Sequence, residues 1–147
     1  MLSPGTILRS TPIMDDPNFL DVLLLITEYN DNGAIGFLFN KPFARNLNEL
    51  IEFRHAREFP LYAGGPVETD KLFFIHQCPA IIEDGTLIND EIYLGGDINQ
   101  AVRAINNKSI SSADIKIFVG YCGWDKGELE AEIEEGSWEF TTVVNVF

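Results

Sequence analysis

The chain has 147 residues, of which 46% are hydrophobic and 22% charged, a balance typical of a globular domain with a real core rather than of a disordered segment. Its 23 acidic residues against 10 basic ones give a net charge of −13, and no concentrated basic patch offsets it. Because nucleic acids and anionic membrane surfaces attract Lys and Arg, this charge argues against direct contact with either.

Two further features narrow the class of protein. No apolar stretch reaches the length of a transmembrane helix, and the N-terminus lacks the basic and apolar regions of a signal peptide. The two cysteines, Cys78 and Cys122, match neither a disulfide framework nor a zinc site. We therefore expect a cytoplasmic protein that holds no metal ion and no cofactor.

The first half of the chain is predicted to be mainly β-structure. Two β-rich runs flank Asn32-Gly33, which is a strong signal for a hairpin, and Pro42 ends the second run. Asn46 with Glu49 three positions later resembles a capping box, so a short helix is predicted from 46 to about 54. The predicted strands of this half span residues 5–8, 22–29, 34–40, 61–63 and 71–77.

The second half alternates strands and helices. Asp97 is placed to cap a helix that ends at Asn106-Asn107, and Asp125 with Glu128 forms a second cap pair for a helix that Gly136 stops. Between these helices, residues 115–122 are the clearest buried strand, and the segment 120–124 is predicted to turn from that strand into the second helix. Further strands are predicted at 91–94 and 138–147.

Several motifs in this order resemble the AlgH/YqgE family of bacterial proteins, and together they cover nearly the whole chain. They are Gly5-Thr-Ile-Leu, Met14-Asp15-Asp16-Pro17-Asn18-Phe19, the run from Gly33 to Pro42, Gly64-Gly65-Pro66-Val67, and the run from Gly120 to Glu130 followed by Trp138. The resemblance implies a single α+β domain over residues 1–147, with a mainly antiparallel, barrel-like β-sheet packed by a few short helices. It implies no shared enzymatic activity.

The chain departs from the family pattern at three places. The family usually has Ser or Ala at the position of Cys122 and Gln at the position of Glu128. Members also commonly continue well past Trp138, whereas this chain stops at Phe147, so the usual C-terminal extension is expected to be missing, through truncation or as a short natural variant.

The leading hypothesis is a non-enzymatic protein that acts through contacts with a protein partner or a small ligand. One member's name suggests regulation of alginate production, so a regulatory role, including transcriptional regulation exerted through a partner, is what the resemblance implies. The alternative is a thiol-dependent hydrolase centred on Cys122, with His76 as its base, because a thiol at a helix N-terminus can have a lowered pKa. The family's tolerance of Ala at that position weighs against the alternative.

Other residues support both a structural and a functional interpretation. The pairs Gly64-Gly65 and Gly95-Gly96 could bring backbone N–H groups close to an anion, but glycines more often serve tight turns. Most of the glutamates of residues 128–135 are expected to face solvent, and Glu130 is the exception, because the family motif shares it and it could accept a hydrogen bond from the preceding turn. Trp138 is expected in the core. The candidate ligand or partner surface comprises Gly64, Gly65, Pro66, Tyr121, Cys122, Gly123, Trp124 and Glu130, and no catalytic residue is assigned.

Overall fold

The computed structural model describes residues 1–142 and 145–147. Within them the chain forms ten strands, two α-helices and three short 3-10 helices. The strands are β1 (Ile7–Ser10), β2 (Leu23–Asn30), β3 (Gly33–Leu38), β4 (Pro42–Asn46), β5 (Pro60–Ala63), β6 (Val67–His76), β7 (Thr86–Leu87), β8 (Tyr93–Leu94), β9 (Ile115–Asp125) and β10 (Trp138–Thr141). The helices are α1 (Ile98–Asn106) and α2 (Glu128–Glu134), with 3-10 helices η1 (Pro17–Phe19), η2 (Leu47–Glu49) and η3 (Ile51–Phe53).

The strands form one sheet in the order β10-β1-β2-β3-β9-β6-β8-β7, with β5 on β9 and β4 on β5. All pairs are antiparallel except β5 with β9. The predicted α+β class and mainly antiparallel sheet are therefore confirmed. Within the described residues β10 pairs only with β1 and β7 only with β8, so the sheet is open and is not closed into a barrel.

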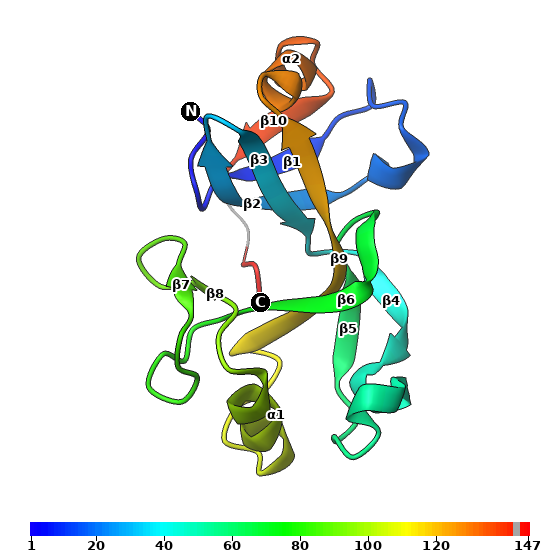
Figure 1. Cartoon of the computed structure of the whole chain (residues 1–147). Coiled ribbons are helices and arrows are strands. Elements are labelled where there is room, and N and C mark those ends of the chain that lie inside the picture. Colours follow the sequence, from blue (N-terminus) through cyan, green and yellow to red (C-terminus); the bar gives the residue numbers. More distant parts are fainter. Residues whose placement is uncertain (143–144) are drawn as a thin grey trace.

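Strand β9 joins two halves of the molecule (Figure 1). Its last residues pair with β3 in the upper half, which also holds β1, β2, β10 and α2. Its first residues pair with β5 on one side and β6 on the other, in the lower half that contains β4–β8 and α1. Every residue from Ile115 to Gly120 is buried, as expected for a strand with neighbours on both edges.

Three apolar clusters form the core. One lies in the lower half, where α1 packs on the sheet, and includes Ile117. Another lies in the upper half around Leu24 and Trp138. The third lies between them around Phe37 and Phe118, and it also takes in side chains of the C-terminal residues. Trp138 is only 1% exposed, which confirms its predicted place in the core.

The hairpin prediction is confirmed, whereas the segment after it differs from expectation. Asn30 pairs with Gly33 at the turn between β2 and β3. Residues 42–46 form β4, which the sequence pattern did not reveal, and the predicted helix from 46 to 54 is instead η2 and η3. Leu50 separates these two turns because its backbone is extended, with φ −86° and ψ 135°. The side chain of Glu49 does accept the N–H of Asn46, as the capping motif predicts.

The C-terminal third corrects a second expectation. Residues 120–124 do not turn into a helix, because β9 continues through them to Asp125. Helix α2 follows after Gly127, whose φ is +83°, and Glu128 accepts a hydrogen bond from the Asp125 N–H at 2.6 Å. The last strand ends at Thr141 rather than 147, and part of the predicted strand, 143–144, lies outside the described residues.

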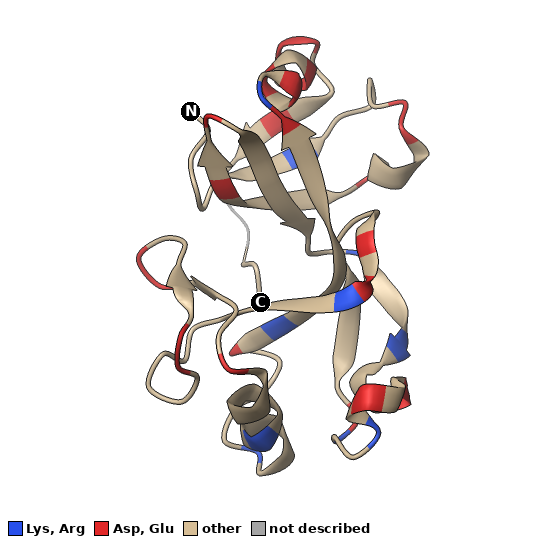
Figure 2. Ribbon diagram, in the orientation of Figure 1, with Lys and Arg blue, Asp and Glu red and all other residues tan. Residues whose placement is uncertain are grey.

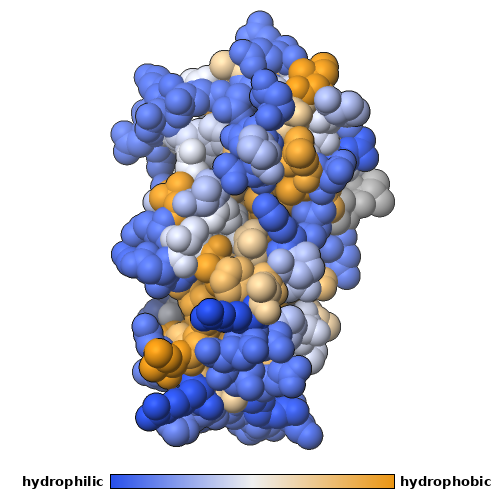
Figure 3. All heavy atoms as spheres, turned by 90° about the vertical axis from the view of Figure 1, so that its right-hand side faces the viewer, coloured by the Kyte–Doolittle hydropathy of each residue, from blue (hydrophilic) through white to orange (hydrophobic). Residues whose placement is uncertain are grey.

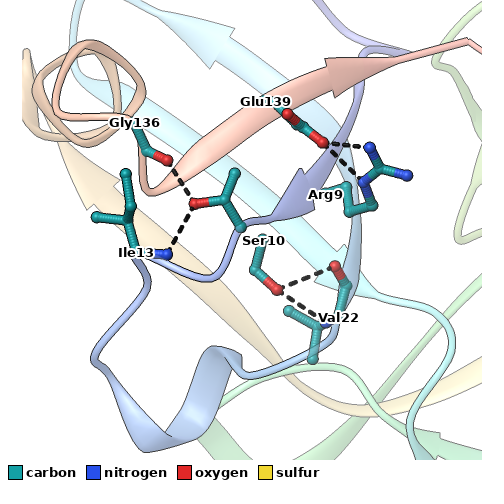
Figure 4. A network of polar contacts seen from close by, with 7 residues as sticks. Arg9, Ser10, Ile13, Val22, Gly136 and Glu139 are labelled. Carbon is teal, nitrogen blue, oxygen red and sulfur yellow. Dashed lines mark hydrogen bonds and ion pairs between the residues drawn. The ribbon is translucent and has the colours of Figure 1, made fainter.

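Polar contacts fasten the two outermost strands of the upper half to their neighbours (Figure 4). The Nε of Arg9 on β1 donates to Glu139 on β10 at 2.9 Å, and the two residues face each other in the strand register. The hydroxyl of Ser10 accepts the Val22 N–H at 2.9 Å.

In the part of the chain that is described, no helix has both the length and the apolar character needed to cross a membrane.

Candidate binding groove

The glycine motifs of the sequence serve a close contact between two backbone segments. A Cβ added to Gly64 would lie 2.4 Å from the carbonyl oxygen of Gly120, and one added to Gly65 would lie 2.2 Å from the carbonyl carbon of Tyr121. Such distances exclude any side chain at these positions. The loop from Gly64 to Pro66 therefore rests directly on β9, and its glycines are needed for packing.

Cys122 lies within β9 and not at a helix N-terminus. Its side chain is 1% exposed, its thiol donates to the Gly64 carbonyl at 3.4 Å, and burial raises its pKa to about 12. His76 pairs with Ile115 in the strand register, which places it about 23 Å along β9 from Cys122 at the usual rise per residue. The arrangement expected for an activated thiol is absent here.

His76 is itself fully used by the fold. Its Nδ1 accepts the Cys78 N–H at 3.1 Å, so its Nε2 carries the proton and donates to the Gly95 carbonyl at 2.9 Å. The ring stacks on Tyr93. Burial lowers the pKa of this histidine, which keeps it neutral. We assign it a structural role.

The tryptophans and two of the glutamates meet beside α2. The indole nitrogens of Trp124 and Trp138 both donate to one oxygen of Glu132, at 3.2 and 3.0 Å. Glu130 accepts the Tyr29 hydroxyl at 2.6 Å, and that hydrogen bond lowers the pKa of Glu130 and raises that of Tyr29. Glu132 thus departs from the expected solvent-facing row, and the sequence alone offered no signal for it beyond its spacing from Trp124 and Trp138.

The surface proposed from the sequence is therefore split between two places. Gly64 and Gly65, which precede Pro66, lie against residues 120–122 of β9, whereas Glu130 lies on α2 in contact with β2. A bulge in β6 extends the first group, because four residues of β6, 68–71, face the single residue Gly120. In that bulge Glu68 has a φ of +49°, and its carboxylate accepts a hydrogen bond from the Lys71 ammonium at 2.8 Å.

The far side of this bulge borders a groove that the sequence analysis did not anticipate. The groove has a volume of about 800 Å³ and opens between β6, the η2–η3 segment and the start of α1. Its lining is mostly apolar, and the apolar side chains among the described residues that form it are Phe43, Leu50, Ile51, Phe53, Leu72, Phe73, Phe74, Leu94, Ile98 and Val119. Figure 3 views the side of the molecule that carries β4 and the bulge, and apolar side chains gather in its lower half between hydrophilic ones.

Charged side chains form the rim of the groove. Glu49, Glu52 and Asp70 supply three carboxylates, and Arg45 and Lys71 supply two cations. Lys71 is already paired with Glu68, so the carboxylates dominate. Figure 2 shows, as red stretches of the ribbon, the acidic residues of the 3-10 segment on this side of the lower half.

Gly95 and Gly96 also line the groove, where they precede α1. Asp97 caps that helix as predicted, accepting the N–H groups of Asn99 and Gln100 at 2.9 and 3.1 Å. The helix N-terminus is therefore occupied by a carboxylate, which would repel an anion. The phosphate-binding interpretation of this glycine pair has no support in the geometry.

A family model described as AlgH-like matches residues 7–145. The chain belongs to the AlgH-like family. A UPF0301 protein of Chlorobaculum tepidum is 38% identical over 138 residues, which cover 94% of this chain and 74% of the relative. A UPF0301 protein of Parabacteroides distasonis is 39% identical over 136 residues, covering 91% of this chain and 69% of the relative.

Two solved structures share the fold of this AlgH-like chain. The solution structure of the AlgH protein from Pseudomonas aeruginosa superimposes with a TM-score of 0.73 at 28% identity, over 98% of this chain and 81% of that one. The crystal structure of protein DIP2367 from Corynebacterium diphtheriae gives 0.79 at 20% identity, over 99% and 78%. At that identity the second likeness concerns the fold alone.

Proposed function

We propose that this AlgH-like chain is a non-enzymatic binding protein whose groove takes an apolar segment of a protein partner. The observation that carries the proposal is the groove itself, where aromatic and aliphatic side chains continuous with the lower core remain open to solvent. Its volume of about 800 Å³ lies within the range of pockets that bind ligands. The proposal treats residues 1–147 as one domain, since β9 pairs with both halves.

The occupant is inferred from the shape and charge of the rim. Ile51 stands on the rim with 85% of its side chain exposed, which suits a broad contact with another macromolecule better than an enclosed small molecule. The three rim carboxylates and the net charge of −13 favour a partner that carries basic residues beside its apolar anchors. Both cysteines are free, which fits action in the reducing cytoplasm.

The binding role is preferred to the thiol-enzyme alternative because Cys122 is buried with a raised pKa and has no histidine beside it. Regulation is then a consequence of binding, since a protein without a reacting centre can act on a pathway only through what it contacts. Direct binding to DNA remains disfavoured by the charge.

The proposal is tested by selecting random dodecamer peptides displayed on phage against the immobilised full chain. We expect the selected peptides to combine bulky apolar residues with Lys or Arg. Ile51→Glu should weaken them at least about tenfold, because it places a charge on the apolar rim. Leu87→Glu is the matched control, since Leu87 is also exposed, at 55%, but lies on β7 outside the groove.

Three results would overturn the proposal. The first is a selection that enriches no peptides, and the second is a set of peptides that bind both variants equally. The third is a metabolite whose stabilising effect on thermal unfolding is lost in Ile51→Glu, because it would make the groove a small-molecule site.

A further inference from the structure

Lys116 is a buried cation in the seam between the two halves of the sheet. It lies on β9 with only 7% of its surface exposed, and within the described residues no carboxylate is within ion-pair distance of it. A buried ammonium without such partners is costly unless other groups replace its water. The contacts that do so define the site.

Those contacts come from both halves and from the C-terminal residues. The ammonium donates to the Phe39 carbonyl at 3.1 Å and to the Val146 carbonyl at 2.6 Å. The ring centre of Tyr62, on β5, lies 4.3 Å from the nitrogen, close enough for a cation–π contact. Phe39 follows β3 in the upper half, so the lysine links β3, β5 and the C-terminal residues.

The C-terminal residues, Asn145–Phe147, lie in this seam without being part of the sheet. They form no strand, and among the described residues their backbone makes no hydrogen bond with the backbone of any strand. Val146 is 5% exposed, and Phe147 packs with it against the middle core cluster. Figure 1 places the C-terminus between the two halves. Lys116 is therefore the main-chain anchor of these residues, and apolar packing supplies the rest.

We propose that the seam over Lys116 is a second binding site, for a short apolar peptide segment, which the chain's own Asn145–Phe147 occupies. The site recognises a backbone carbonyl flanked by apolar side chains, features that do not depend on one sequence. The lysine needs the carbonyl to satisfy its buried charge, and the apolar cluster needs the side chains to exclude water. This inference is independent of the groove, because Lys116, Tyr62 and Val146 are not among the groove's lining residues.

The test empties the site in the full chain with the double variant Val146→Asp/Phe147→Asp. The probe is a fluorescent peptide of the sequence Thr-Val-Val-Asn-Val-Phe, which repeats residues 142–147. We expect saturable binding to the emptied variant and none to the unmodified chain. Adding Lys116→Met should weaken that binding at least about tenfold, because a charge-assisted hydrogen bond is lost. Adding Lys126→Met, which removes an exposed lysine on another surface, should leave it unchanged.

Equal affinity in the presence of Lys116→Met and of Lys126→Met would overturn the proposal, as would a folded emptied variant that fails to bind the peptide. If the emptied variant does not fold, the single variants decide. Carboxypeptidase should then release Phe147 about tenfold faster from Lys116→Met than from Lys126→Met, because the anchor of the segment is gone. Equal release rates would refute the site.

Discussion

Gly65 and Gly120 touch backbone to backbone, so a Cβ on Gly120 would lie 2.3 Å from the Gly65 carbonyl oxygen. This contact is what fixes the loop 64–66 against β9. Gly120 also has a φ of +73°, a conformation that costs an L-residue additional free energy. The close contact and the positive φ therefore each disfavour any residue other than glycine at position 120.

A matched pair of substitutions separates these penalties. Gly127 has a similar φ of +83°, but a Cβ there would meet nothing within 4 Å. We expect Gly127→Ala to lower the free energy of unfolding by about 1 kcal/mol and Gly120→Ala by about 3 kcal/mol or more. Urea denaturation measures both. Equal losses would mean that β9 and the loop can move apart, against the contact described.

Glu132 is predicted to be the most important glutamate of α2 for stability. Glu132→Ala would leave two buried indole N–H groups without an acceptor, so the free energy of unfolding should fall by about 2 to 4 kcal/mol. Glu134 is an exposed glutamate of the same helix, so Glu134→Ala should change the free energy of unfolding by less than about 0.5 kcal/mol. Urea unfolding followed by tryptophan emission is a direct measurement, and similar losses in the two variants would contradict the shared hydrogen bonds.

Because of Lys116, the free energy of unfolding is expected to change with pH in the alkaline range. Burial lowers its pKa from 10.5 to about 8, so between these values the unfolded chain binds a proton that the folded chain has released. The free energy of unfolding should therefore rise with pH across this window. From about pH 7 to about pH 10, the wild type should gain about 1 to 3 kcal/mol relative to Lys116→Met. Lys126→Met should follow the wild type, and a parallel course of all three proteins would disprove the depressed pKa.

The two thiols should differ sharply in reactivity at neutral pH. Cys78 is partly exposed, whereas Cys122 is buried with a pKa of about 12. A thiol reagent should modify Cys78 in the native protein and Cys122 only as fast as the chain opens. Comparing Cys78→Ser with Cys122→Ser by mass spectrometry assigns the labels. Rapid native labelling of Cys122 would revive the thiol-enzyme hypothesis.

Helices and strands could be predicted where a capping residue, a turn motif or a run of apolar residues marked them in the sequence. Asp97 and the apolar spacing after it indicated α1, and Asn32-Gly33 indicated the hairpin. The continuation of β9 beyond Cys122 was missed because Gly123 and the cap pair Asp125 and Glu128 indicated a turn into the helix, whereas pairing with β3 keeps the chain extended to Asp125. Strand β4 was missed because Pro42–Asn46 has no clear apolar alternation, and its pairing with β5 decides its conformation.

The groove could not be predicted because it is a tertiary feature. Phe43, Phe74 and Ile98 come from segments far apart in the chain, and each is an ordinary core residue in its local pattern. The same holds for Lys116, whose partners are carbonyl groups that carry no sequence signature. The sequence analysis named Gly64–Pro66 and Tyr121–Cys122 as parts of one candidate surface, and the structure shows that Gly64 and Gly65 pack against β9 at residues 120–122.

The position of β9 in both halves has a consequence for synthesis of the protein. The ribosome makes residues 115–125 after every other strand except β10, yet β3, β5 and β6 all need β9 as a neighbour. Neither half can complete its sheet on the nascent chain before β9 has been made, so both keep unpaired strand edges until then. Contacts of such long sequence separation slow folding and expose edges that aggregate. The newly made chain should therefore depend on chaperones more than its modest size suggests.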